Sequence, residues 1–136
     1  MKIQSLIMLA TVVLCPLIAQ AATPQHFEVK QTKDIIELCS VSADDPLYVA
    51  AIHFCHGYLV GAYRYHEAST AGPGQTPTVC PPDPKPSRNE AIGMFVNWVK
   101  AHPQYMNERP VDTLARFLNT EWSCEKGKAE KGKANK

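Results

Sequence analysis

The sequence predicts an all-α fold: a small, disulfide-linked domain of four helices with a proline-rich linker between the second and third helices. Two observations lead to this prediction. Apolar side chains recur at helical spacing in separate segments, several of which begin with residues that cap helices. No segment shows the sustained alternation of apolar and polar residues that indicates a strand.

Residues 1–21 have the pattern of a secretory signal peptide. Lys2 precedes an apolar run at 6–18, and residues 19–21 form the small-x-small sequence Ala-Gln-Ala that signal peptidase cleaves. The run is shorter than the roughly 20 apolar residues that cross a bilayer. We therefore expect an exported protein whose mature chain begins at Ala22.

Removal of the signal peptide discards Cys15 and leaves an even number of cysteines. The remaining ones are Cys39, Cys55, Cys80 and Cys124. In an oxidising compartment an even count indicates disulfides rather than free catalytic thiols. Each disulfide would stabilise this small core by on the order of 3 kcal/mol.

Capping residues and apolar spacing place the first two helices. Thr32 can cap a short helix that carries apolar side chains over residues 35–39. Asp45-Pro46 combines a capping carboxylate with a proline at the first helical position. We expect the second helix to begin there and to run to about Glu67.

The second half of the chain predicts two more helices after a linker. Residues 71–86 are too rich in proline and glycine to form a regular element. Ser87 and Glu90 have the spacing of a capping box, which opens a third helix that ends before Pro103. Apolar side chains then recur at helical spacing over 110–124 and predict the fourth helix.

The cysteines allow three disulfide pairings. If the third and fourth helices pack antiparallel across their short connection, the start of one lies beside the end of the other. This geometry favours a Cys80–Cys124 disulfide. Cys39 and Cys55 would then join the first helix to the second.

The segment HFCHGYLVGAYRYH, residues 53–66, brings three histidines close to a cysteine and suggests a metal site or a cysteine nucleophile. Successive helical residues turn by about 100°, so Cys55 falls on the core stripe, with His53 about 160° and His56 about 100° away. Such side chains do not converge on one ion or one reacting atom. We therefore predict no metal site here, with His53 and His56 facing solvent and His66 partly buried.

Gly57 and Gly61 fall on the opposite side of the same helix, together with Ala50. A glycine inside a helix costs roughly 1 kcal/mol against alanine, so the pair indicates the close approach of another backbone. The neighbour is either another helix of the same chain, which we favour, or a second chain in a homodimer.

Residues 125–136 form a basic, low-complexity tail in which the motif EKGKA occurs twice. The tail has no apolar side chain larger than alanine, so we expect it to be disordered and to keep the protein soluble. Weak attachment to anionic lipid or cell-wall polymer is the alternative. The folded domain is then residues 22–124, which is mildly acidic, and nucleic acid is not a predicted partner.

Several short motifs, taken in order, resemble those of one family. Residues 55–61, CHGYLVG, are similar to the Cys-x-Gly-Tyr-Ile-x-Gly core of the Rap/Tai family, which are periplasmic immunity proteins against amidase toxins of the type VI secretion system. The Cys-Pro at 80–81, the helix end at 99–103 and the Trp-x-Cys at 122–124 continue the match. The resemblance covers about residues 35–124.

The resemblance implies a periplasmic protein that plugs the active-site groove of a peptidoglycan amidase toxin from another cell. It implies inhibition by occlusion, without an enzymatic activity, a cofactor or a metal of its own. Members of the family are reported as dimers, and this suits the strip of Ala50, Gly57 and Gly61.

An inhibitor of this kind needs a loop that protrudes from a rigid frame. We expect the connection after the third helix to be that loop, with Tyr105, Met106 and Arg109 as anchors. Its predicted partner-binding residues are Gln104, Tyr105, Met106, Asn107, Glu108 and Arg109. The alternative is the linker from Ser69 to Thr78, whose ordering on binding would cost more free energy.

A second hypothesis is a periplasmic stress protein or acid-responsive chaperone with no toxin partner, because protonation of the histidines near pH 6 can open an interface. An enzyme is not predicted. The sequence has no local serine-histidine-aspartate signature, no glycine-rich phosphate loop and no convincing pair of carboxylates on one face.

Overall fold

The computed structural model of the protein describes residues 21–70 and 72–125, and within them it confirms the all-α fold. In chain order the elements are the 3-10 turn η1 Pro24–Glu28, the helices α1 Thr32–Cys39, α2 Tyr48–Thr70 and α3 Arg88–Ala101, the 3-10 turn η2 Pro103–Tyr105, and the helix α4 Pro110–Glu121. Residues 1–20 of the predicted signal peptide and 126–136 of the predicted tail lie outside the described residues. In the part that is described, no helix has the length and apolar character needed to cross a membrane.

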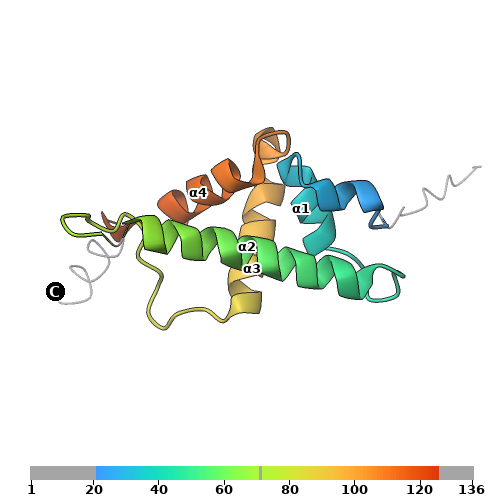
Figure 1. Ribbon diagram of the computed structural model, residues 1–136, viewed down its shortest axis with the longest axis horizontal. Helices are drawn as coiled ribbons and strands as arrows, with labels where there is room; N and C mark the ends of the chain where they lie inside the picture. The colour runs from blue at the N-terminus through green and yellow to red at the C-terminus, as the bar shows by residue number, and fades with distance from the viewer. Residues whose placement is uncertain (1–20, 71, 126–136) are drawn as a thin grey trace, which may run out of the picture.

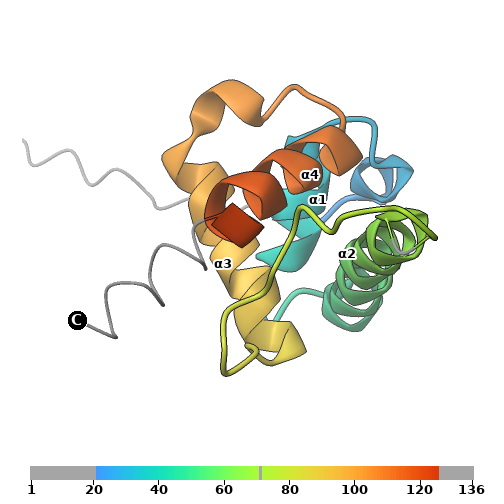
Figure 2. The same ribbon diagram turned by 90° about the vertical axis from the view of Figure 1, so that its left-hand side faces the viewer.

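The long helix α2 lies along one side of the other three helices (Figure 1). A view turned by 90° looks nearly along α2 and shows α1, α3 and α4 together on one side of it (Figure 2). On that side Ala51, Cys55 and Leu59 are buried, at successive turns of one helix face. The helical spacing thus placed Cys55 on the correct face, toward the core.

The core lies where α2 meets the other helices. Phe95 of α3 and Phe117 of α4 are fully buried and meet edge to face, with 5.6 Å between their ring centroids. Ile35 and Leu38 of α1 are fully buried in the same cluster. The apolar stripes that predicted the helices are therefore the surfaces that hold them together.

Helix α2 begins at Tyr48 and not at Pro46 as the capping pattern predicted. The Asp45 carboxylate does accept a hydrogen bond from the Leu47 N–H, at 2.7 Å, but this bond holds a turn that precedes the helix. The second carboxylate oxygen accepts a hydrogen bond from the Ala22 N–H at 3.0 Å. Asp45 therefore ties the start of the described chain to the start of α2.

The capping box that predicted α3 is present. Ser87 Oγ accepts a hydrogen bond from the Glu90 N–H at 3.3 Å, and the Glu90 carboxylate accepts one from the Ser87 N–H at 2.8 Å. These bonds to Ser87 lower the pKa of Glu90, because they favour its charged form. The helix ends at Ala101, before Pro103.

Two disulfides close the domain, and they are the pairs that the packing argument favoured. Cys39 at the end of α1 is bonded to Cys55 in α2. Cys80 in the linker is bonded to Cys124, which follows α4. The first therefore joins two neighbouring helices, and the second closes a much longer loop.

The proline-rich linker is also hydrogen-bonded to the chain after α4. The Cys80 N–H donates to the Trp122 carbonyl at 2.6 Å, and the Cys124 N–H donates to the Thr78 carbonyl at 3.0 Å. These bonds form one antiparallel β-bridge. The linker is thus held near its middle, at the disulfide.

Candidate partner-binding surface

The connection from α3 to α4, residues 102–109, folds into short turns. Pro103 cannot continue α3, because it has no N–H to donate, and it begins the turn η2. The N–H groups of Tyr105 and Met106 donate hydrogen bonds to the carbonyls of His102 and Pro103, each at 3.1 Å. Hydrogen bonds within the loop therefore pair some of its own N–H and carbonyl groups.

The first turn of α1 holds this loop from the side. The Thr32 N–H donates a hydrogen bond to the Glu108 carbonyl at 2.8 Å, and the Lys33 N–H donates one to the Met106 carbonyl at 2.9 Å. N–H groups in the first turn of a helix have no partner inside that helix. The loop carbonyls accept hydrogen bonds from two of these N–H groups, and α1 in turn fixes the loop.

A pair of buried hydroxyls completes this attachment. Thr32 Oγ1 donates to the Glu108 carbonyl at 3.0 Å and lies 2.8 Å from Thr113 Oγ1 of α4. Because the Thr32 hydroxyl proton is used by the carbonyl, Thr113 is the donor to Thr32. Both threonines are 0% exposed. We call the contacts among Thr32, Thr113 and the Glu108 carbonyl the threonine clamp.

Tyr105 contacts the body of the domain. Its ring stacks on Trp98 of α3, with 5.3 Å between centroids and 3° between planes, and the Arg116 guanidinium of α4 lies 4.7 Å from its centroid. Arg116 also reaches the Glu108 carboxylate, at 3.4 Å. The His102 ring stacks on Trp98 at 4.3 Å. These contacts hold the loop against α3 and α4.

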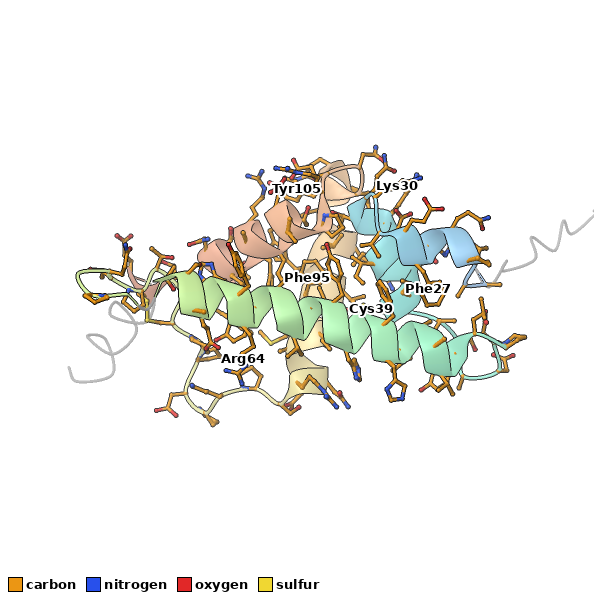
Figure 3. All side chains as sticks on the ribbon, viewed as in Figure 1. Phe27, Lys30, Cys39, Arg64, Phe95 and Tyr105 are labelled. Carbon is orange, nitrogen blue, oxygen red and sulfur yellow. A yellow bond between two sulfur atoms is a disulfide. The ribbon has the colours of Figure 1, made fainter. Side chains whose placement is uncertain are left out.

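The predicted partner-binding residues divide by exposure: Gln104, Asn107 and Arg109 are exposed, and Tyr105, Met106 and Glu108 are half-buried. Met106 packs against the core, so of the three expected anchors only Arg109 is exposed. Arg109 forms an ion pair with Asp112 at 2.7 Å. Tyr105 and Lys30 lie at the upper edge of the molecule in Figure 3, above α2. We call Gln104, Asn107 and Arg109 the loop tip.

The alternative loop, from Ser69 to Thr78, is held differently. Its first residues belong to α2, and residues 73–78 are all exposed. The Gln75 N–H donates to the Gly72 carbonyl at 3.0 Å, which closes one turn, and the Thr78 carbonyl is held by Cys124. The segment is therefore fixed at its end rather than along its length.

The histidines of α2 lie on different faces of the helix. His53 is exposed, whereas His56 and His66 are half-buried, so His56 faces solvent less than expected. Burial, together with the charges of Arg88 and His53, lowers the pKa of His56. In the described part of the chain, no group of histidine, cysteine and carboxylate side chains is placed to hold a metal ion.

The strip of Ala50, Gly57 and Gly61 is exposed, and the neighbour that we favoured for it is wrong. A Cβ atom at either glycine would meet no atom within 4 Å apart from nearby backbone of α2 itself. The reason is that α1, α3 and α4 all pack on the other side of α2 (Figure 2). No other helix of the described chain fills this face.

Thr32, Thr113 and Trp98 attach the loop, and sequence reasoning missed this role. Thr32 was expected to cap the first helix, but it is the first residue of α1, with Gln31 at the N-cap. Its partners Glu108 and Thr113 are 76 and 81 residues away, beyond the reach of local patterns. One signal in the sequence is Thr113, a polar residue beside the apolar stripe of α4. A hydroxyl at such a position is expected to be buried, and a buried hydroxyl needs a hydrogen-bond partner.

The fold and the loop define a class of protein: a small helical domain that is closed by two disulfides and carries an ordered loop with polar residues at its tip. A sequence profile of the Rap1a immunity proteins matches residues 31–124, and the chain belongs to this family. Comparisons with curated proteins and with solved structures find no match.

Family membership gives the protein a function of a general kind. The chain is an immunity protein, and its partner is a toxin effector. Rap1a immunity proteins are periplasmic and generally not enzymes. The two disulfides fit an exported protein, because disulfides persist in oxidising compartments.

Proposed function

We propose that the protein binds a peptidoglycan amidase toxin in the periplasm and occludes its active site. The toxin partner follows from the family, and the amidase class rests on the resemblance of residues 55–61 and of the motifs up to 124. The observation that carries the proposal is the loop 102–109, which the threonine clamp and the Tyr105 stack hold in one conformation.

A loop held in this way suits inhibition by occlusion. Because α1, α3 and α4 fix the loop in advance, less conformational entropy is lost when the toxin binds. Two of the three tip residues, Gln104 and Asn107, carry side-chain amides. An amidase groove recognises amide groups by hydrogen bonds, so these side chains can satisfy the same donors and acceptors as a substrate. Neither side chain places a main-chain amide bond in the groove, so the amidase has no bond to cleave.

The proposal is tested with the amidase encoded nearest to the gene. The purified proteins should form a complex on a sizing column, and cells that export the immunity protein should survive periplasmic delivery of the amidase. Changing the loop tip by Gln104→Ala, Asn107→Ala and Arg109→Ala together should weaken binding by about a hundredfold, because anchors at an interface centre carry most of the affinity.

The matched control changes exposed residues of the other loop, by Gln75→Ala and Thr76→Ala. This variant should bind the amidase as well as the unchanged protein does. Loss of binding in the linker variant and not in the tip variant would reassign the binding loop. Continued lysis, with no complex on the column, would contradict the amidase proposal itself.

We also propose that the protein is exported with cleavage before Ala22. The observation that supports this site is that Ala22 is buried and its nitrogen lies 3.0 Å from an Asp45 carboxylate oxygen, whereas Ala21 is exposed. Cleavage would turn the Ala22 amide into a charged amine beside that carboxylate. An ion pair would then replace a neutral donor, and charge-assisted hydrogen bonds are the stronger kind.

Asp45→Asn tests this pairing, because it removes the charge and keeps an oxygen that can accept from the Leu47 N–H. Mass spectrometry of the exported protein should show an N-terminus at Ala22. Asp45→Asn should lower the free energy of unfolding by about 1 kcal/mol at pH 6. The difference should disappear as the pH rises past the ordinary pKa of an α-amine, about 8, because the ion pair needs the charged amine. A different N-terminus, or a loss that is the same at every pH, would contradict the proposal.

We propose further that a second copy of the chain packs on the strip of Ala50, Gly57 and Gly61. Empty space at both glycines lets another helix backbone approach. Tyr65, one helical turn after Gly61, is 77% exposed and would supply apolar contact area. Both observations suit the dimers reported for the family that the sequence resembles.

Alanine substitution separates a dimer from a monomer. In a monomer, Gly57→Ala with Gly61→Ala should raise stability by roughly 1 kcal/mol per site, because both positions are helical and have free space. In a dimer the same change should weaken association, which sedimentation measures. Gly93→Ala in α3, where a Cβ also has free space, is the control. A protein that sediments as a monomer at all concentrations would contradict the dimer.

A further inference from the structure

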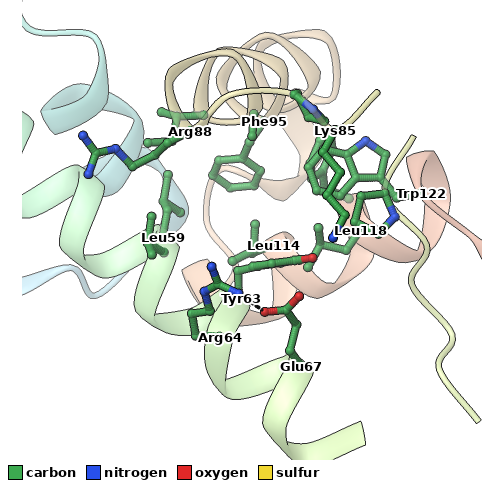
Figure 4. A pocket seen from close by; sticks show the side chains of 16 residues that line it. Leu59, Tyr63, Arg64, Glu67, Lys85, Arg88, Phe95, Leu114, Leu118 and Trp122 are labelled. Atoms are coloured by element: carbon green, nitrogen blue, oxygen red, sulfur yellow. Dashed lines mark hydrogen bonds and ion pairs between the residues drawn. The ribbon is translucent and has the colours of Figure 1, made fainter. Parts of the chain in front are cut away.

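An apolar groove opens between α2 and the helices α3 and α4. It encloses a cavity of about 300 Å³, at the lower end of the range for small-molecule sites. Its wall on α3 includes Ala91 and Phe95, early in the helix, whereas the loop tip follows the end of the same helix. The buried residues that form its interior are Leu59, Phe95, Leu114, Phe117, Leu118 and Trp122. Figure 4 shows Leu59, Phe95 and Leu118 around the hollow.

Charged side chains stand on the rim of this groove, and most of them are cationic. Arg64, Lys85 and Arg88 line the groove together with a single carboxylate, Glu67. Glu67 is paired with Arg64 at 2.6 Å, as the dashed line in Figure 4 marks. Within the described residues, neither Lys85 nor Arg88 makes an ion pair. The mouth of an apolar groove therefore carries an excess of positive charge.

The protonation states of Glu67 and Tyr63 preserve this excess of positive charge at neutral pH. Partial burial alone would raise the pKa of Glu67, but hydrogen bonds from Arg64 and Tyr63 and the charges of Arg64 and Lys85 lower it. Burial and the contact with Glu67 raise the pKa of Tyr63 to about 12. Glu67 is therefore already ionised and paired, and Tyr63 is neutral, so no further negative charge develops at the rim below pH 10.

We propose that this groove binds a linear hydrocarbon chain that ends in a carboxylate, with the chain between α2, α3 and α4 and the carboxylate at Lys85. Arg88 lies at the other end of the rim, with its guanidinium directed away from Lys85 (Figure 4). The apolar interior suits a hydrocarbon, and Lys85 on the rim complements one anionic head group. The small volume and buried interior favour a slim chain over a bulky ring system. The protein's own C-terminal segment does not suit the site, because residues 126–136 are rich in lysine and have alanine as the largest apolar side chain.

Calorimetric titration of the exported protein with decanoate, below the concentration at which it forms micelles, tests the proposal. Saturable binding of one decanoate per chain is expected. Lys85→Glu should weaken it by about tenfold, because an attractive contact becomes repulsive. Lys100→Glu, an exposed residue of α3 that does not line the groove, should leave it unchanged. 1-Decanol, which has the same chain length and no charge, should bind the unchanged protein about tenfold more weakly than decanoate does.

Ala91→Leu provides a second, independent test, because a larger side chain on the groove wall should exclude the hydrocarbon. Circular dichroism during the titration should show constant helix content. Absence of saturable binding, equal losses in the Lys100 variant, or binding only as the helices unfold would overturn the proposal. Each measurement is made without a toxin, so its failure leaves amidase inhibition untouched, and loss of the amidase complex would not affect the groove.

Discussion

The connection from α3 to α4 and the linker from α2 to α3 both cross the edge of the core, but different bonds hold them. In the first, residues 102–109, main-chain carbonyls of Met106 and Glu108 accept hydrogen bonds from α1. In the second, a disulfide at Cys80 and the β-bridge beside it hold the chain. The first is held by polar groups from a distant part of the chain, and the second by a covalent bond.

The difference follows from the residues available in each segment. The linker contains Pro73, Pro77, Pro81, Pro82, Pro84 and Pro86. Proline has no N–H to donate, so a backbone rich in proline forms few hydrogen bonds with the rest of the domain. The Cys80–Cys124 disulfide therefore provides much of the attachment that main-chain hydrogen bonds would otherwise give. The shorter connection has Pro103 alone before Pro110, and its carbonyls are met by free donors at the start of α1.

Removal of the Cys80–Cys124 disulfide should have the largest effect. Cys80→Ser with Cys124→Ser should lower the free energy of unfolding by about 4 kcal/mol, because the disulfide closes a loop with a sequence separation of 44. Denaturant unfolding measures the loss. Hydrogen exchange should rise at the Cys80 and Cys124 amides and stay low at Lys33. Equal acceleration at all three would show that the two connections are not held independently.

The second largest effect is expected at the threonine clamp. Thr32→Val keeps the shape of the side chain, removes the donor to the Glu108 carbonyl and leaves the Thr113 hydroxyl buried without its partner. The free energy of unfolding should fall by about 2 kcal/mol. Exchange at the Lys33 amide should rise, and the linker amides should not change. Thr120→Val on the exposed face of α4 is the control and should change stability little.

A smaller effect is expected at Gly74 in the linker. Its φ of +79° is a conformation that other residues rarely adopt, so Gly74→Ala should cost about 1 kcal/mol. Gly72→Ala, where the new Cβ would make an ordinary contact with Gln75 at 3.5 Å, is the control. Thermal unfolding measures both. A Gly74 variant as stable as the control would mean that this part of the linker is not held in one conformation.

The smallest effect expected is a change in the pKa of Tyr63. Tyr63 lines a hollow with Pro77, Val79 and Pro81 of the linker, and burial is the main cause that raises its pKa to about 12. In the Cys80→Ser, Cys124→Ser variant, the pKa of Tyr63 should fall toward 10, because the linker no longer covers it. The absorbance of the phenolate measures this, with Tyr63→Phe to identify the signal. An unchanged pKa would show that the linker stays in place without its disulfide.

Local signals in the sequence predicted most of the fold. The Ser87–Glu90 capping box is a contact between residues three apart, and it formed as its spacing suggests. The Cys55 stripe depends on helical periodicity alone, and it faces the core. The start of α2 was misplaced because the Asp45 carboxylate holds a turn before the helix, through the Leu47 N–H. The same carboxylate binds Ala22, a contact 23 residues away that local patterns do not contain.

The candidate site was predicted less well, and for the same physical reason. The loop was located by the helix ends on either side of it, which are local features. Which of its side chains point outward depends on Trp98, Arg116 and α1, which come from three other elements. Tyr105 and Met106 were therefore chosen as anchors for their chemistry, whereas the structure uses them to attach the loop. The glycine strip was placed on the correct face, but its neighbour was not.

The chemical nature of the hydrogen-bond acceptors in the loop affects which substitutions the protein can tolerate during evolution. The atoms of the loop that α1 grips are carbonyl oxygens, which every amino acid possesses. Substitutions at Gln104, Asn107 or Arg109 therefore alter what the loop presents without removing what holds it. If the loop tip binds the toxin as proposed, recognition can change with the toxin while the scaffold stays constant, and the same separation would let new tip sequences be grafted onto this frame.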